Sequence, residues 1–213
     1  MSVRRFSLIT EADARQIEPG STVELEAGGM VTPLARETLA ARRVTVAALG
    51  ATDSALPADL APITPVVRVA IGSDHTGLTL KAHLVAQLRG AGKSVTDHGT
   101  MTADPVDYPD IAASVAKAVA RKEADGGIVI DGAGLGSAIA ANKVRGALAA
   151  MCTTPTLARY AREHNGAKVL ALGATLVSAA EAAEIVEMFL TTPTKEPRYL
   201  RRLLKVRRLE ERF

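Results

Sequence analysis

The residues best suited to chemistry lie in residues 126–136, GGIVIDGAGLG. An apolar run ends at Asp131, and three glycines follow within five residues. Glycines let the backbone approach a ligand closely, and N–H groups at the start of a following helix bind anions. A carboxylate facing such N–H groups can act as a general base toward an anionic substrate. The alternative is an ordinary strand–loop–helix turn in which Asp131 caps the helix.

Strand and helix patterns alternate five times after residue 66, which predicts a Rossmann-like, doubly wound α/β fold with a five-stranded parallel sheet. The expected strands are 66–72, 94–99, 126–131, 147–152 and 168–173, and the expected helices are 78–92, 110–122, 137–143, 155–164 and 178–190. In such sheets ligands bind at the carboxyl ends of the strands, where the strand order reverses.

The candidate functional residues follow expected strand ends: Asp74, His75, Asp107, Tyr108, Asp131 and the loop 132–136. His164 and Asn165 follow an expected helix, and we expect them to turn back toward the same edge. The sequence therefore predicts one site at the carboxyl edge of the sheet.

Composition excludes several classes of protein. The chain has 213 residues, of which 47% are hydrophobic and only 3% aromatic, so it can form a large aliphatic core. The single cysteine, Cys152, excludes an internal disulfide framework and fits a reducing cytoplasm. No secretory signal, apolar stretch of transmembrane length or cluster with metal-ligand spacing is visible. We expect a cytoplasmic protein without a metal ion.

The charge is small overall but concentrated at one end. The formal net charge is +3, and many basic residues lie in the final segment, KEPRYLRRLLKVRRLEERF. A basic tail could bind nucleic acid, but this one lacks interleaved aromatic residues. Leucines at roughly helical spacing favour an amphipathic helix that docks on a partner subunit.

Four segments are expected along the chain. Residues 1–50 form a small α+β extension, with a helix starting at 10–13, a strand at 22–26, a helix at 34–42 and a strand at 43–49. Residues 51–65 are proline-rich and predict a linker. Residues 66–206 form the main domain, and residues 207–213 form a basic tail.

The loops of the main domain together resemble the ribose-5-phosphate isomerase B family, which includes the galactose-6-phosphate isomerase subunits. The resemblance covers residues 67–206 and rests on five motifs in family order: VAIGSDHTGLTLK (69–81), DYPD (107–110), GGIVIDGAGLGSAIAANKVRG (126–146), REHNGAKVLALGA (162–174) and PRYLRR (197–202). It implies aldose–ketose interconversion of a phosphorylated sugar, by a homodimer or dimer of dimers with no metal or organic cofactor.

The resemblance also implies roles for individual residues. Asp74 and His75 match a substrate-contacting pair, His164 matches the histidine that opens the sugar ring, and Asn165 matches a neighbouring substrate ligand. Gly132, Ala133, Gly134, Leu135 and Gly136 match the loop that stabilises the enediolate. Arg198 and Arg202 match phosphate-binding arginines on a helix that reaches the neighbouring subunit's site. Tyr108 lies near the sugar in the family, although a packing role is equally consistent with its sequence, and His83 and His98 match no functional position.

The departures from the family concern the catalytic loop. Asp131 stands where many members have Cys, and Ser137 stands where others have Glu, so Asp131 is the one acidic group expected to move the proton between C1 and C2. Ala133 replaces a Thr or Ser, and Thr175 and Leu148 replace arginines. These changes argue for a shifted substrate or for lost activity. Our hypothesis is an active isomerase for ribose 5-phosphate or a related C4–C6 sugar phosphate. The alternatives are a non-catalytic sugar-phosphate binding or scaffold module, and an epimerase on the same scaffold.

Residues 7–48 have a different resemblance. SLITEADAR, PGSTVEL and VTPLARETLAARRVTV are similar to the N-terminal segment of the corrinoid adenosyltransferase of ethanolamine utilisation. This similarity suggests that the extension docks on bacterial microcompartment shell proteins or partner enzymes. The alternative is a small accessory subdomain with no targeting role.

Overall fold

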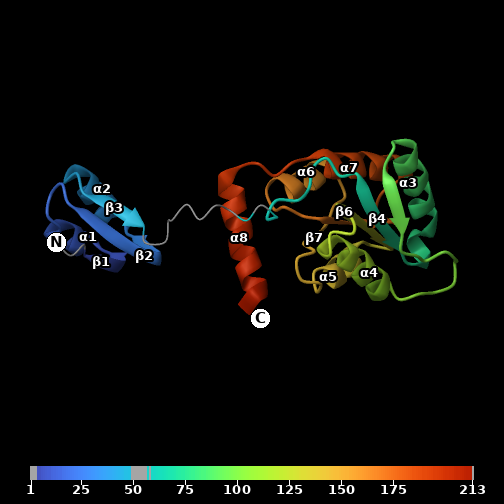
Figure 1. Ribbon diagram of the computed structural model, residues 1–213, viewed down its shortest axis with the longest axis horizontal. Helices are drawn as coiled ribbons and strands as arrows, with labels where there is room; N and C mark the ends of the chain where they lie inside the picture. Colours follow the sequence, from blue (N-terminus) through green and yellow to red (C-terminus); the bar gives the residue numbers. More distant parts are fainter. Residues whose placement is uncertain (1–3, 49–56, 58, 213) are drawn as a thin grey trace. The chain divides into compact units, whose positions relative to one another are not determined.

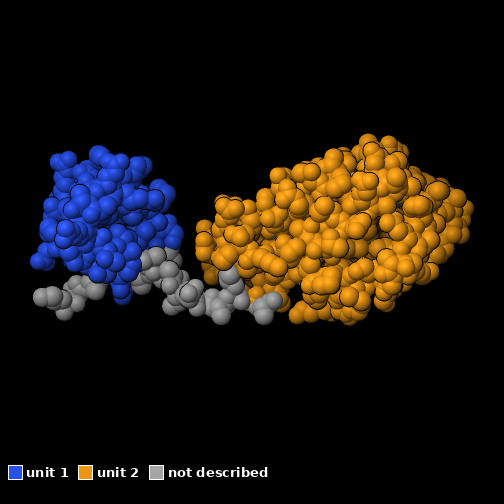
Figure 2. Space-filling view, turned by 90° about the horizontal axis from the view of Figure 1, so that it is seen from above, with its two compact units in different colours: residues 1–55 blue, residues 56–213 orange. Residues whose placement is uncertain are grey.

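The computed structural model describes residues 4–48, 57 and 59–212. The chain forms two compact units, Met1–Ala55 and Leu56–Phe213, which are coloured separately in Figure 2. Much of the expected linker, residues 51–56 and 58, lies outside the described residues.

The first unit is a three-stranded parallel sheet with two helices. Its elements are β1 (Arg5–Ile9), α1 (Glu11–Gln16), β2 (Thr22–Val31), α2 (Pro33–Ala41) and β3 (Thr45–Ala48), and the strand order is β1-β2-β3. Thr10 and Asp13 form a reciprocal capping box that begins α1, and Thr32 caps α2 with Pro33 in its first turn. Strand β1 was not predicted from the sequence, and β2 extends five residues beyond the expected end at residue 26.

The second unit is a doubly wound α/β domain (Figure 1). Its five parallel strands have the order β5-β4-β6-β8-β7. The strands are β4 (Arg68–Ser73), β5 (Ser94–Asp97), β6 (Gly126–Asp131), β7 (Ala149–Met151) and β8 (Val169–Gly173). The helices are α3 (Leu78–Gly90), α4 (Tyr108–Ala120), α5 (Leu135–Ala141), α6 (Pro155–Glu163), α7 (Ala179–Thr191) and α8 (Pro197–Arg212), and a 3₁₀ turn, His75–Gly77, precedes α3.

Each face of this sheet has its own apolar core. Ile71, Ile128 and Ile130 pack with residues of α3, α6 and α7, whereas Val129 and Ala171 pack with residues of α4 and α5. The strands are buried on both sides, as their continuous apolar runs predict. This arrangement confirms the predicted fold class.

The strand order reverses between β4 and β6. The chain passes from β4 outward to β5 and then returns to place β6 on the other side of β4. Asp74 follows β4 and Asp131 ends β6, so both acids lie at the switch point where doubly wound proteins bind ligands.

Several sequence-based helix boundaries differ from the structure. Helices α4 and α5 begin two residues before the expected starts, at Tyr108 and Leu135. Helix α8 continues through residue 206 to Arg212, so residues 207–212 are the last turns of this helix rather than a separate tail. No helix in the described part of the chain is long and apolar enough to cross a membrane.

Candidate active site

Asp131 is held by the loop that follows it. Its Oδ1 accepts hydrogen bonds from the N–H groups of Ala133, at 2.8 Å, and Gly134. Its Oδ2 accepts from the N–H of Ser137 at 2.7 Å. The side chain is buried with 5% of its surface exposed. Asp131 therefore caps the start of α5, which is the alternative that the sequence left open.

This contact changes the interpretation of the loop. The N–H groups of Ala133 and Gly134 were expected to face a developing negative charge on the substrate, but both already face the Asp131 carboxylate. In this conformation, the chain's own carboxylate thus occupies the two N–H groups that the sequence assigned to an anion hole. The physical reason is local: a short acidic side chain at a strand end reaches the N–H groups two and three residues ahead.

The shape of the loop requires its glycines. Gly134 has φ 76°, and a Cβ atom there would lie 2.8 Å from the carbonyl carbon of Leu172. A Cβ on Gly173 would lie 2.7 Å from the backbone of Ala133. The loop therefore packs directly on the end of β8. Two backbones approach this closely only where glycines leave out the Cβ atom.

The segment after β4 lies against the same loop. Asp74 donates its backbone N–H to the carbonyl of Ile130 at 3.0 Å, and its Oδ1 accepts from the N–H groups of Thr76 and Gly77. A Cβ on Gly77 would lie 2.7 Å from the side chain of Ile130, which shows how closely the two segments approach. The structure thus brings Asp74 and Asp131 to one edge, as predicted.

Tyr108 and His75 complete this edge. A Cβ on Gly136 would lie 2.6 Å from Cζ of Tyr108, so the phenol ring covers the start of α5. His75 accepts the N–H of Val106 through Nδ1 at 3.4 Å, which attaches the loop before Tyr108 to the turn after β4. We call Asp74, His75, Tyr108, Asp131 and the loop 132–136 the carboxyl-edge cluster.

His164 and Asn165 lie in a second cluster. The imidazole of His164 lies between two tyrosine rings. It stacks on Tyr160, with ring centroids 4.7 Å apart, and Tyr199 meets it at a tilt, with centroids 4.4 Å apart. Arg198 donates to the hydroxyl of Tyr199 at 2.9 Å, and Arg202 lies over the same ring. His164, Asn165, Tyr199 and Arg202 line a pocket of about 470 Å³. We call these residues, with Tyr160 and Arg198, the amino-edge cluster.

The expectation that His164 turns back to the carboxyl edge is wrong. Helix α6 starts after the carboxyl end of β7 and runs back to precede β8, so His164 emerges at the amino edge of the sheet. The same pocket is lined by Ala149 and Ala150, the first residues of β7. A helix that connects two parallel strands must return to the opposite edge, and it takes its C-terminal residues there.

Sequence reasoning missed several contributors. Tyr160 and Tyr199 sandwich the histidine, and their only sequence signal is their spacing of four residues from His164 and three from Arg202. The hydroxyl of Thr175 donates to the carbonyl of Gly132 at 2.7 Å, so the residue that replaces an arginine supports the loop.

Two observations bear on other chemistry. Among the described residues, no group of three or more His, Cys, Asp or Glu side chains is arranged to hold a metal ion. Cys152 is buried, and desolvation raises the pKa of its thiol to about 11, which disfavours the reactive thiolate.

The second unit is therefore a doubly wound α/β protein with a carboxylate-bearing, glycine-rich loop at its switch point, the place where this class binds small ligands. The family model described as Ribose/Galactose Isomerase matches residues 69–206. The chain belongs to this family, as the sequence motifs predicted.

Individual relatives agree with this assignment. A ribose-5-phosphate isomerase B of Escherichia coli K12 is 41% identical over 145 residues, which are 68% of this chain and 97% of that protein. The structure of ribose-5-phosphate isomerase B of Clostridium thermocellum is 44% identical with a TM-score of 0.67, over 68% of this chain and 98% of that one. A similar structure from Mycoplasma genitalium, with bound ribulose-5-phosphate, is 40% identical with a TM-score of 0.67, over 68% of this chain and 97% of that one.

Proposed function

We propose that the protein is a sugar-phosphate aldose–ketose isomerase that interconverts ribose 5-phosphate and ribulose 5-phosphate, or a related C4–C6 pair. The observation that carries the proposal is the family match across residues 69–206, which includes both functional clusters. The relative with bound ribulose-5-phosphate supports a phosphorylated ketose as the ligand of this fold.

The reaction needs an acid and base for ring opening, a base for the proton at C1 and C2, and cations for the phosphate. His164 is the proposed ring-opening group, since its imidazole lies in a pocket with Asn165 and Arg202. Arg198 and Arg202 are the proposed phosphate ligands, because guanidinium groups bind phosphate oxygens through paired N–H donors. Both arginines are exposed on α8.

Asp131 is the proposed base for proton transfer between C1 and C2. Its Oδ2 accepts one hydrogen bond, from Ser137, and a carboxylate oxygen can accept two. The second lone pair is available to a proton of the substrate. The capping contacts then hold the carboxylate in a fixed orientation, which general-base catalysis requires.

We further propose that the active site is shared between two copies of the chain, in a homodimer or dimer of dimers. The two clusters lie at opposite edges of one sheet, so one copy cannot bring His164 to Asp131 without refolding. A second copy placed with its amino-edge cluster against the carboxyl-edge cluster would complete the site. Leu135 and Ile139 on α5, 59% and 64% exposed, offer an apolar contact beside the loop.

The test is an NMR assay of the full chain with ribose 5-phosphate in D₂O. Formation of ribulose 5-phosphate would support the proposal, and the deuterium content at C2 of recovered ribose 5-phosphate would report exchange of the transferred proton with solvent. Conversion of no member of a panel of C4–C6 aldose and ketose phosphates would overturn it. Retained phosphate affinity in that case would favour the binding-module alternative, and inversion at one carbon would favour an epimerase.

We propose a cytoplasmic location and assign the first unit to docking within a bacterial microcompartment. The support is its resemblance to the segment of the ethanolamine-utilisation enzyme and its separation as a compact unit. Co-sedimentation of residues 1–55 fused to a reporter with purified microcompartments tests this assignment, and a reporter without the segment is the control.

A further inference from the structure

We call the second unit, Leu56–Phe213, the isomerase unit. It contains another cavity, away from the carboxyl-edge cluster. Its volume is about 340 Å³, toward the lower end of the range for small-molecule sites. Five segments contribute to its walls: residues 59–60, the end of α4 with the turn after it, residues 145–148, Lys168 before β8, and α8 from Leu203 onward. Asp59, Leu60 and the α8 residues after 206 lie outside the family match, so this cavity depends on parts that the family model does not include.

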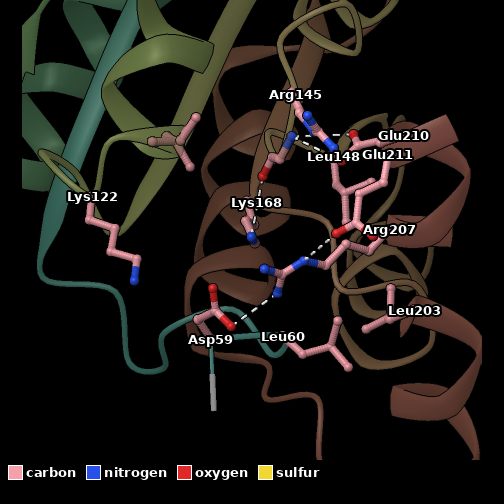
Figure 3. A pocket seen from close by; sticks show the side chains of 13 residues that line it. Asp59, Leu60, Lys122, Arg145, Leu148, Lys168, Leu203, Arg207, Glu210 and Glu211 are labelled. Atoms are coloured by element: carbon pink, nitrogen blue, oxygen red, sulfur yellow. Dashed lines mark hydrogen bonds and ion pairs between the residues drawn. The ribbon is translucent and has the colours of Figure 1, made fainter. Parts of the chain in front are cut away.

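The cavity is lined by four cations, Lys122, Arg145, Lys168 and Arg207, of which three carry the argument. Lys122 follows α4, Lys168 precedes β8, and Arg207 belongs to α8 (Figure 3). Desolvation is the largest cause that lowers the pKa of Lys168. The charges of Arg207 and Lys122 lower it further, whereas the carboxylates of Asp59 and Glu210 raise it. Charges of both signs therefore act on this ammonium group.

The lysines lack strong partners. The ammonium group of Lys168 can donate three hydrogen bonds, but the structure gives it one acceptor, the carbonyl of Gly146 at 3.2 Å. Within residues 4–48, 57 and 59–212, neither Lys122 nor Lys168 forms an ion pair within 4.0 Å. A half-buried ammonium with so few partners is stabilised by an anion.

Three carboxylates already line this cavity. Glu210 accepts the N–H of Gly146, Glu211 lies 3.7 Å from the guanidinium of Arg207, and Asp59 contacts the same guanidinium. The Asp59 carboxylate accepts a hydrogen bond from Arg207 at 3.0 Å. This hydrogen bond is the main cause that lowers the pKa of Asp59, and the charges of Arg207 and Lys122 lower it further. Figure 3 shows Asp59 among the three cations. The ion pair is weak and replaceable, because both side chains are more than 40% exposed, Asp59 at 45% and Arg207 at 41%.

We propose that this cavity is an anion site for the phosphate group of a small metabolite or for inorganic phosphate, with Lys122, Lys168 and Arg207 as its ligands and Asp59 as an internal competitor. A phosphate dianion offers more acceptor oxygens and more charge than the carboxylate, so it displaces Asp59 from Arg207. Leu148 and Leu203 separate the cavity from the His164 pocket, since both line the two cavities.

The test is a titration of the full chain with inorganic phosphate. Binding is measured from the NMR shifts of the amide groups of Gly146, Leu148 and Lys168. Arg198→Met and Arg202→Met are both present throughout, so that the proposed catalytic phosphate site does not contribute. Binding is then independent of isomerase activity, and failure here leaves the proposed function untouched.

Three further variants in that background decide the outcome. Lys168→Met and Lys122→Met should each weaken the binding of phosphate about tenfold, which is the effect of losing one charge-assisted contact. Asp59→Asn should strengthen it several-fold, because the competitor is removed. Lys205→Met is the control, since Lys205 is an exposed α8 residue that does not line the cavity. Lys122 is exposed, so its variant tests the site without disturbing the core.

Phosphate shifts confined to the cavity, with this ranking of variants, would establish the site. Absence of shifts at Gly146 and Lys168, equal effects of Lys168→Met and Lys205→Met, or weaker binding by Asp59→Asn would overturn the proposal. A parallel titration with ribose 5-phosphate separates the two sources: tighter binding identifies a phosphorylated metabolite, and equal binding identifies phosphate itself.

Discussion

The two edges of the sheet hold their functional groups by different means. At the carboxyl edge, backbone N–H groups fix the buried acids Asp74 and Asp131. At the amino edge, His164 is held by two aromatic rings, and Arg198 and Arg202 lie exposed on α8. The first cluster is complete within one chain, whereas the second presents exposed cations that lack an anionic partner among the described residues.

This difference matches the two tasks that we propose for the clusters. Proton transfer at carbon requires a base in a fixed position, and a backbone-held carboxylate meets that requirement. Phosphate binding requires charge and reach, which flexible arginines on an exposed helix provide.

The largest effect is expected for Asp131→Asn. An amide removes the proposed base and places an N–H₂ group where the N–H of Ser137 now donates. Turnover should fall about 100-fold to 10,000-fold, the range for loss of a general base. Steady-state kinetics measures the loss, and phosphate inhibition should stay nearly unchanged. Asp110→Asn, an exposed acid in the first turn of α4, is the control. Full turnover by Asp131→Asn would place the base elsewhere.

Gly134→Ala tests the backbone side of the comparison. The new Cβ meets backbone atoms at 2.8 Å and also strains a residue with φ 76°. The free energy of unfolding should fall by roughly 3 kcal/mol, from strain and overpacking together. Gly92→Ala is a matched control, because Gly92 has φ 76° and nothing within 4 Å of its Cβ position. Urea denaturation should show the larger loss for Gly134→Ala, and equal losses would mean that the loop can move off β8.

Mixed dimers test whether one active site combines the carboxyl edge of one copy with the amino edge of another. Asp131→Asn and His164→Ala should each be nearly inactive alone. Co-expressed in equal amounts, they should recover about a quarter of the wild-type activity, because half of random dimers carry both variants and each of these has one intact site. Recovery of no activity would indicate a site built within one chain.

The smallest effect is expected for Arg202→Met. Loss of one charge-assisted phosphate contact should raise KM about tenfold. The effect should shrink at high salt, because this arginine is exposed. Arg201→Met is the control, since Arg201 is also exposed on α8 but does not line the His164 pocket. An equal rise for both variants would show a general loss of positive charge rather than a specific contact.

Much of the isomerase unit follows from local sequence. Alternation of apolar strands and amphipathic helices predicted the five parallel strands. The position of Asp74 just after β4 and of Asp131 at the end of β6 predicted the carboxyl-edge cluster. These features depend on neighbours along the chain, so propensity and periodicity record them. The family motifs added the expected chemistry, and the family match bears out the assignment.

Only the tertiary structure decided three other points. It turned Asp131 into the cap of α5, because loop geometry sets which N–H groups a short carboxylate reaches. The tertiary structure places His164 at the amino edge of the sheet, because helix α6 starts at the carboxyl edge and must end at the other one. It also brought Asp59 to Arg207, 148 residues away along the chain, in a contact that no local pattern can encode. The sequence by itself determined which residue types follow each element, and the packing of those elements determined which of them meet.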